Sequence, residues 1–248
     1  MSFLHVLLNF NNKISDKFLH LPDEVINVAV TRREKWLKQK ANRIKKGSLV
    51  LDAGAGQCPY KKLFSHCKYK SQDFVQYSGT KIGVQLEKWK YGEIDYVCDI
   101  LEIPVPDKTF HVVICTEVLE HVPFPVETIA SLARVLKKGG TLLLTAPLAS
   151  GLHQEPYHFY GGFTPHFYRK VFETYGLRLD EITPEGGLLA HTAQEIFRSS
   201  QVLAKSQRWG LIKRYLFGKL LPTYFYSLDS SYPVKEFTIG YMIQATKI

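Results

Sequence analysis

Hydrophobic and polar positions in this 248-residue chain alternate between a helical and an extended period. Apolar residues recur at helical spacing in three segments, at 23–46, 125–136 and 163–175. Short apolar runs, several of them β-branched, predict seven strands, at 48–51, 69–72, 94–97, 111–115, 141–145, 177–182 and 237–246. Because strands and helices alternate, the pattern predicts an α/β fold with a doubly wound, seven-stranded, mostly parallel, Rossmann-like sheet.

Two features depart from simple alternation. The helix at 23–46 is long, and we expect its basic residues on an outer face: Arg32, Arg33, Lys35, Lys38, Lys40 and Arg43. Before the last strand, which we expect to be antiparallel, a basic and apolar stretch at about 184–236 predicts a helical insert. We therefore expect one domain with an N-terminal helical extension (1–47), a ligand-binding core (48–147) and a second half (148–248).

Candidate chemistry lies where the strands end. Ligands of doubly wound sheets bind beyond the carboxyl ends of the strands, and acidic residues follow the first four strands: Asp52, Asp73, Asp99 and Glu117. Gly54 and Gly56 follow Asp52 in a G-x-G pattern, which permits a sharp turn and close ligand approach. A carboxylate at Asp73 can accept hydrogen bonds from both ribose hydroxyls of an adenosine ligand, with a solvated loop aspartate as the simpler alternative.

Several motifs occur in a specific order between about 48 and 147. They read Val50-Leu-Asp-Ala-Gly-Ala-Gly56, Asp73, Cys98-Asp99-Ile100, Ile103-Pro-Val-Pro-Asp107-x-x-Phe110-His-Val-Val113, Thr116-Glu-Val-Leu-Glu-His-Val122 and Arg134-Val-Leu-Lys-Lys-Gly-Gly140. This order and spacing resemble the class I S-adenosylmethionine-dependent methyltransferases, in their broad small-molecule branch. One departure is that the family's usual third glycine is Cys58 here.

The resemblance implies S-adenosylmethionine as the cofactor and methyl transfer as the activity. It assigns Gly54 and Gly56 to the methionine part, Asp73 to the ribose, and Asp99 with Ile100 to the adenine, while Asp52 and Glu117 complete the cofactor-binding set. The cofactor has no phosphates, so a complete phosphate-binding loop is unnecessary, and its positive sulfur is compatible with nearby carboxylates. The missing third glycine also counts against a nicotinamide-dependent oxidoreductase.

The loop after the fifth strand predicts the side on which the methyl acceptor binds. It crowds histidines and aromatic rings into residues 153–160. We expect His158 to take a proton from an acceptor hydroxyl, with His153 as the second candidate, because a histidine titrates near working pH. Tyr157, Phe159 and Tyr160 are candidates for stacking on a sugar or aromatic ring. The alternative is a lid loop whose rings pack together and whose histidines make structural hydrogen bonds.

Two other histidine interpretations follow from position. His121 opens the segment after the fourth strand, where a structural hydrogen bond is favoured over a role as catalytic base. No spacing forces His153, His158 and His166 to converge, so no metal site is expected.

Net charge and cysteine content limit the classes of binding partner and the cellular compartment that the sequence favours. A formal net charge of +9 suits nucleic acid, an anionic membrane or a phosphorylated substrate, and equally a basic enzyme without such partners. No base-directed Asn/Asp-Pro-Pro-aromatic motif occurs, so no nucleic-acid partner is expected. The basic insert is compatible with a peripheral membrane contact, although a pocket cover or a dimer contact is the favoured interpretation. The four cysteines have no metal-ligand spacing, and the N-terminus lacks the features of a leader peptide. Both observations predict a cytoplasmic protein.

The sequence therefore predicts an S-adenosylmethionine-dependent methyltransferase that O-methylates a small or sugar-bearing metabolite, glycan or lipid-linked. The sugar-bearing acceptor follows from the resemblance of the histidine-and-aromatic segment to family members linked to surface glycans. Two alternatives stay open, a catalytically silent S-adenosylmethionine-binding protein of the same fold and a nucleic-acid methyltransferase. The oligomeric state is left open.

Overall fold

The computed structural model describes residues 21–79, 89–204, 209–234 and 236–248, which form two compact units. The sheet unit comprises residues 33–185 and 239–248. The helical unit comprises the described residues of the ranges 1–32 and 186–238. The predicted organisation as one domain stays a prediction, and residues 1–20 of its N-terminal extension lie outside the described residues.

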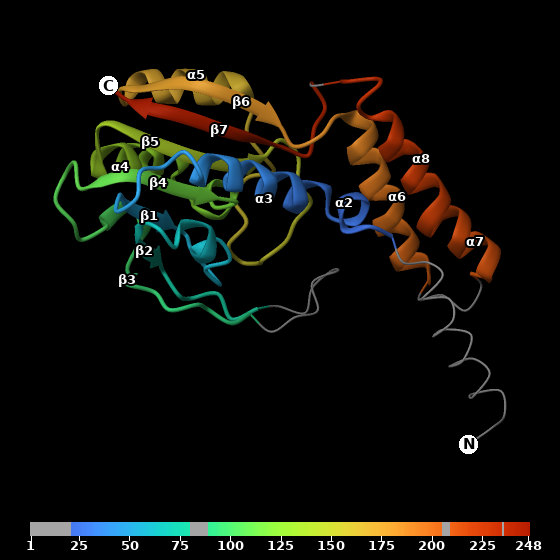
Figure 1. Cartoon of the computed structure of the whole chain (residues 1–248). Helices are drawn as coiled ribbons and strands as arrows, with labels where there is room; N and C mark the ends of the chain where they lie inside the picture. The colour runs from blue at the N-terminus through green and yellow to red at the C-terminus, as the bar shows by residue number, and fades with distance from the viewer. Residues whose placement is uncertain (1–20, 80–88, 205–208, 235) are drawn as a thin grey trace. The chain divides into compact units, whose positions relative to one another are not determined.

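The sheet unit contains a seven-stranded sheet with the order β3-β2-β1-β4-β5-β7-β6 (Figure 1). Its strands are β1 (Leu49–Ala53), β2 (Lys68–Asp73), β3 (Tyr96–Val97), β4 (Phe110–Thr116), β5 (Leu136–Pro147), β6 (Leu177–Pro184) and β7 (Gly240–Lys247). All neighbours pair in parallel except β7, which is antiparallel to both β5 and β6. The predicted sheet, including its antiparallel last strand, is confirmed.

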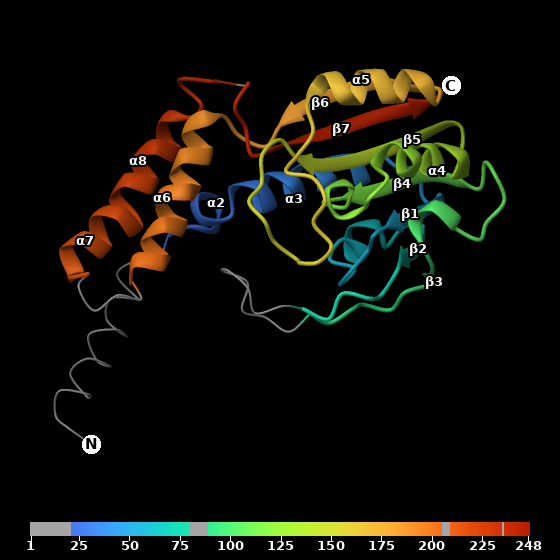
Figure 2. The ribbon, with the colours of Figure 1, turned by 180° about the vertical axis from the view of Figure 1, so that it is seen from behind.

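Alternate residues of the strands supply two cores on opposite faces of the sheet, as the period of two requires. On one face, Trp36 and Leu37 of α3 (Val28–Ala41) pack against Val50 and Val112. On the other face, α4 (Pro125–Val135) and α5 (Pro165–Thr174) pack against strand residues such as Leu51. Figures 1 and 2 show these two faces. Packing in the two cores determines the positions of the strands. The strands in turn position the loops that follow their carboxyl ends.

The N-terminal helical segment differs from its prediction in two ways. It is divided into α2 (Asp23–Ile26) and α3, which ends at Ala41 instead of near 46. Its basic residues do not all face outward, because Arg33 is only 7% exposed and Lys40 is similarly buried. Each has an acidic partner, Glu185 for Arg33 and Glu181 for Lys40, so the burial of these cations is compensated.

The helical unit is built from α2, α6 (Leu188–Ala204), α7 (Leu211–Tyr215), a π-helical turn (Leu216–Leu220) and α8 (Leu221–Leu228). Helix α6 packs against α8 and α2. The buried Asp229 carboxylate accepts hydrogen bonds from the Gly187 and Ala190 amides at the start of α6, and it pairs with Arg32 at 3.1 Å. The predicted helical insert is confirmed. Among the described residues, no helix has the length and apolar character needed to span a bilayer.

Candidate active site

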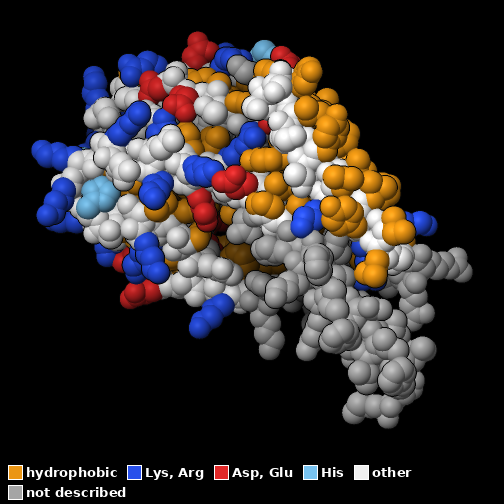
Figure 3. Space-filling model, turned by 45° about the vertical axis from the view of Figure 1, so that its right-hand side comes forward, with side chains coloured by type: hydrophobic (Ala, Val, Ile, Leu, Met, Phe, Trp, Pro, Cys, Tyr) orange, Lys and Arg blue, Asp and Glu red, His pale blue; other side chains and the backbone are white. Residues whose placement is uncertain are grey.

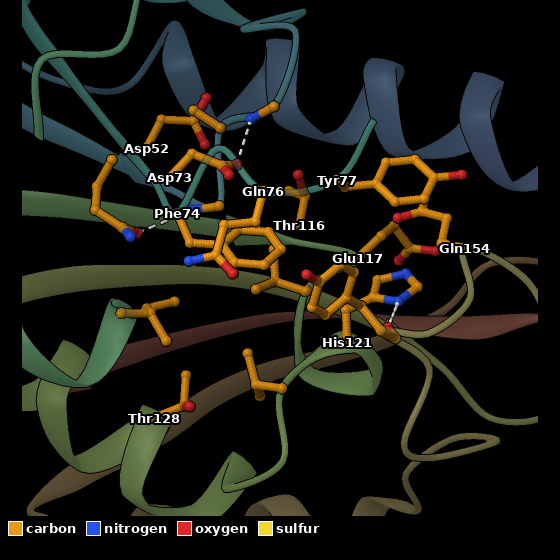
Figure 4. A pocket seen from close by; sticks show the side chains of 18 of the residues that line it. Asp52, Asp73, Phe74, Gln76, Tyr77, Thr116, Glu117, His121, Thr128 and Gln154 are labelled. Carbon is orange, nitrogen blue, oxygen red and sulfur yellow. Dashed lines mark hydrogen bonds between the residues drawn. The ribbon is translucent and has the colours of Figure 1, made fainter. Parts of the chain in front are cut away.

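A cavity of about 700 Å³ opens in the sheet unit at the carboxyl ends of the strands, within the usual size of a small-molecule site. It is bordered by all seven residues predicted to bind the cofactor: Asp52, Gly54, Gly56, Asp73, Asp99, Ile100 and Glu117. Figure 4 shows several of them directed toward one space. The structure thus brings the predicted set together, while its binding role stays a prediction.

The loop after β1 requires glycine for geometric reasons. Gly54 and Gly56 both have positive φ, at +71° and +52°, a region that other residues rarely adopt. A Cβ on Gly54 would collide with the Val118 side chain, and one on Gly56 would meet Trp89 at 2.9 Å. The Gly56 amide donates to Asp73 Oδ2 at 2.9 Å, which ties the loop to the end of β2. The turn is therefore closely packed as well as sharp.

Two carboxyl groups lie at the ends of β1 and β2. Asp73 also accepts a hydrogen bond from the Val75 amide, so backbone amides orient both of its oxygens. Asp52 is buried and accepts a hydrogen bond from the Tyr69 hydroxyl. Burial, with the Asp73 charge adding to it, raises the pKa of Asp52 to about 7 although the Tyr69 hydrogen bond opposes the shift. Asp52 therefore changes charge near neutral pH.

The Glu117 carboxylate is held at the end of β4 by two side chains. Arg33 Nη2 lies 2.9 Å from one of its oxygens, and the Thr145 hydroxyl donates to the other at 2.8 Å. Glu117 also has a φ of +54°, a strained conformation that often accompanies a functional site. The pattern of the sequence did not identify Arg33, which borders the cavity, because its helical position resembles that of a solvent-exposed basic residue.

Aromatic residues from the sequence segments just before and just after residues 80–88, which lie outside the described residues, form one wall of the cavity. Tyr77, Trp89 and Tyr91 border the cavity, with ring centroids 5.4 Å apart for the first pair and 6.0 Å for the second. Phe74 meets Tyr157 edge-to-face at 4.9 Å. Phe74, Tyr77, Trp89 and Tyr91 were not predicted as cavity residues, because they lie in a segment without a hydrophobic period. Their aromatic character is the signal that could have identified them.

The acceptor loop, residues 148–164, supplies another part of the border. Tyr157 and Phe159 line the cavity as expected for stacking groups, whereas Tyr160 does not. The predicted bases His158 and His153 are also absent from the cavity lining. His121, to which the sequence analysis gave a structural hydrogen bond, does line it.

His121, His153 and His158 form a histidine cluster. Their ring centroids lie 4.5 Å apart for His153 and His158, 4.8 Å for His121 and His153, and 5.8 Å for His121 and His158. The structure therefore groups the two predicted bases behind one cavity-lining histidine.

Burial keeps His121 neutral. Burial first, and then the two neighbouring histidines, lower the pKa of His121 to about 4, although its hydrogen bond to the Tyr157 carbonyl opposes the shift. That carbonyl can only accept, so Nδ1 of His121, 2.6 Å away, carries the proton and Nε2 has a free lone pair. Burial also lowers the pKa of His158. Neutral imidazoles of this kind can accept a proton or bind a cation.

The fold and the cavity together define a class of protein, a doubly wound α/β protein with a cavity of small-molecule size beside the G-x-G loop after β1. Residues 51–144 match the family of methyltransferase domains. This match to a methyltransferase domain agrees with the resemblance to class I S-adenosylmethionine-dependent methyltransferases that the sequence motifs indicate. The match bears out the expected methyltransferase domain and S-adenosylmethionine as the cofactor that such domains use.

A curated relative is an uncharacterized protein of Methanocaldococcus jannaschii, 31% identical over 112 residues that cover 45% of this chain. The chain spans about half, 46%, of the length of that relative.

Three solved structures share the fold. A SAM-dependent methyltransferase from Archaeoglobus fulgidus has a TM-score of 0.53 and 16% identity, over 91% of this chain and 97% of its own. Phosphoethanolamine N-methyltransferase 2 of Haemonchus contortus, in complex with S-adenosyl-L-methionine, has a TM-score of 0.52 and 15% identity, over 88% and 52%. The [4+2]-cyclase SpnF has a TM-score of 0.55 and 16% identity, over 87% and 81%. At these identities the likeness extends to the fold alone.

Proposed function

We propose that the protein transfers the methyl group of S-adenosylmethionine to a hydroxyl of a small or sugar-bearing metabolite, glycan or lipid-linked. One observation carries the methyltransferase part of this proposal. All seven residues that the family resemblance assigns to the cofactor border a single cavity, and all seven lie within the segment that matches the methyltransferase domain.

The side chains around the cavity fit this cofactor. A cationic sulfonium is compatible with the Glu117 carboxylate, which Arg33 and Thr145 hold in place, and with the ionised form of Asp52. Asp73 keeps acceptor capacity for ribose hydroxyls because each carboxylate oxygen has two lone pairs. Ile100 is buried beside the cavity and suits an adenine face. Bound there, the cofactor would supply an electrophilic methyl group.

The acceptor side of the proposal rests on the histidine cluster and the aromatic border. A hydroxyl becomes a good nucleophile only as its proton leaves, so a base within hydrogen-bond reach accelerates transfer. We assign this role to His158, with His153 as the second candidate. His121, which contacts both in the histidine cluster, is the member that borders the cavity. Tyr157 and Phe159 would stack on the acceptor. A small acceptor is consistent with the Haemonchus protein, which is named for phosphoethanolamine.

Peripheral contact with an anionic membrane is also part of the proposal. In the helical unit, Ile212 is 84% exposed, and other large apolar side chains of α7 and the segment after it are exposed as well: Leu211, Tyr215, Phe217, Leu220 and Tyr224. Figure 3 shows hydrophobic side chains gathered over these helices. Lys213 is exposed among them, so an apolar and cationic surface faces solvent. Such a surface suits anionic lipid, and it would favour a lipid-linked acceptor.

Calorimetry and a transfer assay test the proposal together. The purified chain should bind S-adenosylmethionine and S-adenosylhomocysteine, and radiolabelled methyl groups should pass to a hydroxyl-bearing compound in a panel of sugar, glycan and lipid-linked fractions. Binding without transfer to any fraction would favour the catalytically silent alternative. Absence of binding would reject the proposed function altogether.

A further inference from the structure

A buried glutamate and two histidines converge at the acceptor end of the cavity. One metal-binding atom of each of Glu120, His121 and His153 lies within 4.8 Å of the other two. We propose that these three residues bind a divalent transition-metal ion, for which Zn²⁺ is the probe. This site is additional to the cofactor. With His153 as a metal ligand, His158 is the base.

The tautomers of the two histidines suit metal binding. Nδ1 of His121 donates to the Tyr157 carbonyl at 2.6 Å, and Nδ1 of His153 donates to the Gly151 carbonyl at 2.8 Å. Each donation fixes the proton on Nδ1 and leaves the Nε2 lone pair available. Metal-binding histidines usually make this kind of hydrogen bond through the nitrogen that does not contact the metal.

Unpartnered buried atoms point to a missing ligand at the same place. Glu120 is only 1% exposed, and among the described residues its Oε2 atom and Nε2 of His121 have no hydrogen-bond partner. The other Glu120 oxygen lies 3.7 Å from His121 Nε2, which is too long for a hydrogen bond. Buried polar atoms without partners are costly and uncommon in folded proteins. A cation between these atoms would satisfy both.

The ligand set and its surroundings match a site with an open position. Two histidines and one glutamate are the protein ligands of several catalytic zinc sites, in which water or substrate takes the fourth position. His121 borders the cavity, so that position would face the acceptor space. Ligand atoms of a tetrahedral zinc site lie about 3.4 Å apart. Binding would therefore draw the most widely separated pair, within 4.8 Å here, closer by up to about 1.4 Å. His153 is partly exposed on the acceptor loop and can make that movement.

The fold produces this convergence, which sequence spacing alone does not. Glu120 and His121 lie on a short 3-10 turn, Leu119–His121, after β4. The Glu120 carbonyl accepts the Phe159 amide at 2.8 Å, which anchors the acceptor loop over this turn. His153 is thereby brought beside a pair that is more than thirty residues away in the chain.

The role of the ion rests on the proposed function. An acceptor hydroxyl bound at the open position would lose its proton more readily, because a bound cation stabilises the oxyanion. The proton would pass to His158, the histidine of the cluster outside the ligand set. The oxygen would form its bond to the methyl carbon as the bond between that carbon and sulfur breaks, which releases S-adenosylhomocysteine.

Zinc binding to the untagged full-length protein tests the inference. After metal removal by a chelator, we expect one Zn²⁺ per chain in competition with a chromogenic chelator, and Co²⁺ should give visible d–d absorption. Glu120→Gln and His153→Gln should each weaken binding by more than about 100-fold, beyond the loss typical of outer-shell changes. His158→Gln and the surface variant His166→Gln are the matched controls, and both should bind zinc like wild type.

Three outcomes would overturn the proposed site. They are no zinc uptake by the wild type, unchanged affinity in His153→Gln, or an equal loss in His158→Gln. Binding of S-adenosylmethionine is measured on the same samples. If the cofactor binds and zinc does not, the metal site is wrong and the proposed function stands; the reverse result rejects the function and leaves the metal site intact.

Discussion

The cavity has two walls that are built differently. The cofactor wall, formed by residues at the carboxyl ends of β1, β2 and β4 and directly after them, rests on parallel strands in fixed register. In that register Asp52 pairs with Ser71 on one side and with Ile114 on the other. The acceptor wall consists of the acceptor loop and the 3-10 turn at Leu119–His121, which are joined by a few backbone hydrogen bonds. Sheet geometry thus determines one wall, and local loop contacts determine the other.

The two walls also differ in charge. The cofactor wall presents carboxylates, among them Asp52, Asp73 and Glu117, as suits a cationic ligand. The acceptor wall presents His121 and aromatic rings, as suits a neutral hydroxyl compound. If the proposed function holds, cofactor binding and acceptor activation are therefore separable, because different walls of the cavity carry them. Variants in one wall should leave the function of the other largely intact.

The largest effect is expected from Gly54→Val in the cofactor wall. The new side chain would collide with Val118 at a position of positive φ, and it would displace the border of the methionine site. Calorimetry should detect no binding of S-adenosylmethionine. Gly139→Val is the matched control, because that glycine also has positive φ but nothing lies within 4 Å of its added Cβ. Wild-type affinity in Gly54→Val would refute the assignment of this wall.

His158→Ala should impair only the proposed function of the acceptor wall, which is activation of the acceptor hydroxyl. Loss of the proposed base should lower the rate of methyl transfer by about 10²–10⁴-fold, the usual contribution of general base catalysis. Affinity for S-adenosylmethionine should change little, because His158 lies in the acceptor loop and not among the residues assigned to the cofactor. Normal turnover would mean that histidine is not the base and that another group, such as His121 or Glu117, carries the step.

The pH dependence of cofactor affinity should report on Asp52. Its pKa of about 7 means that the carboxyl is neutral below this pH and ionised above it. If the sulfonium prefers the ionised form, affinity should rise about tenfold between pH 6 and pH 8. Asp52→Asn should lose this rise, and comparison of the two proteins cancels the titration of the cofactor itself. A parallel pH profile in both would exclude Asp52 from the cofactor wall.

The smallest effect concerns the helical unit, outside both walls. Ile212→Asp should lower cosedimentation with phosphatidylserine-containing vesicles about fivefold, as expected for loss of about 1 kcal/mol of apolar burial. Binding should also weaken as salt rises. The control is Ile248→Asp, which changes an exposed isoleucine at the far end of the sequence. No vesicle binding by the wild type at low salt would favour a pocket cover or dimer contact for the insert.

The convergence of the cofactor-wall residues on one cavity was predictable from the sequence for a physical reason. Strand ends in a parallel sheet meet at one edge, so Asp52, Asp73, Asp99 and Glu117 could be brought together without knowledge of side-chain contacts. Glycine at Gly54 likewise signals a backbone requirement that local sequence records directly.

The acceptor wall was less predictable because its geometry depends on long-range contacts. The order of His153 and His158 along the loop does not reveal that both lie behind His121. Arg33 was assigned to an exposed face because its helix is basic overall, and only the tertiary structure pairs it with Glu117 and Glu185. Long-range ion pairs and the hydrogen bonds that hold loops in place produce no periodic pattern in the sequence from which they could be predicted.

A crystal structure of the complex with S-adenosylhomocysteine tests the central claim most directly, because it locates every part of the ligand at once. The account predicts the ribose hydroxyls at Asp73, the amino-acid part beside Gly54 and Gly56, and the adenine against Asp99 and Ile100. A ligand bound elsewhere on the chain, or bound in the cavity without contact to Asp73 and the glycine loop, would contradict it.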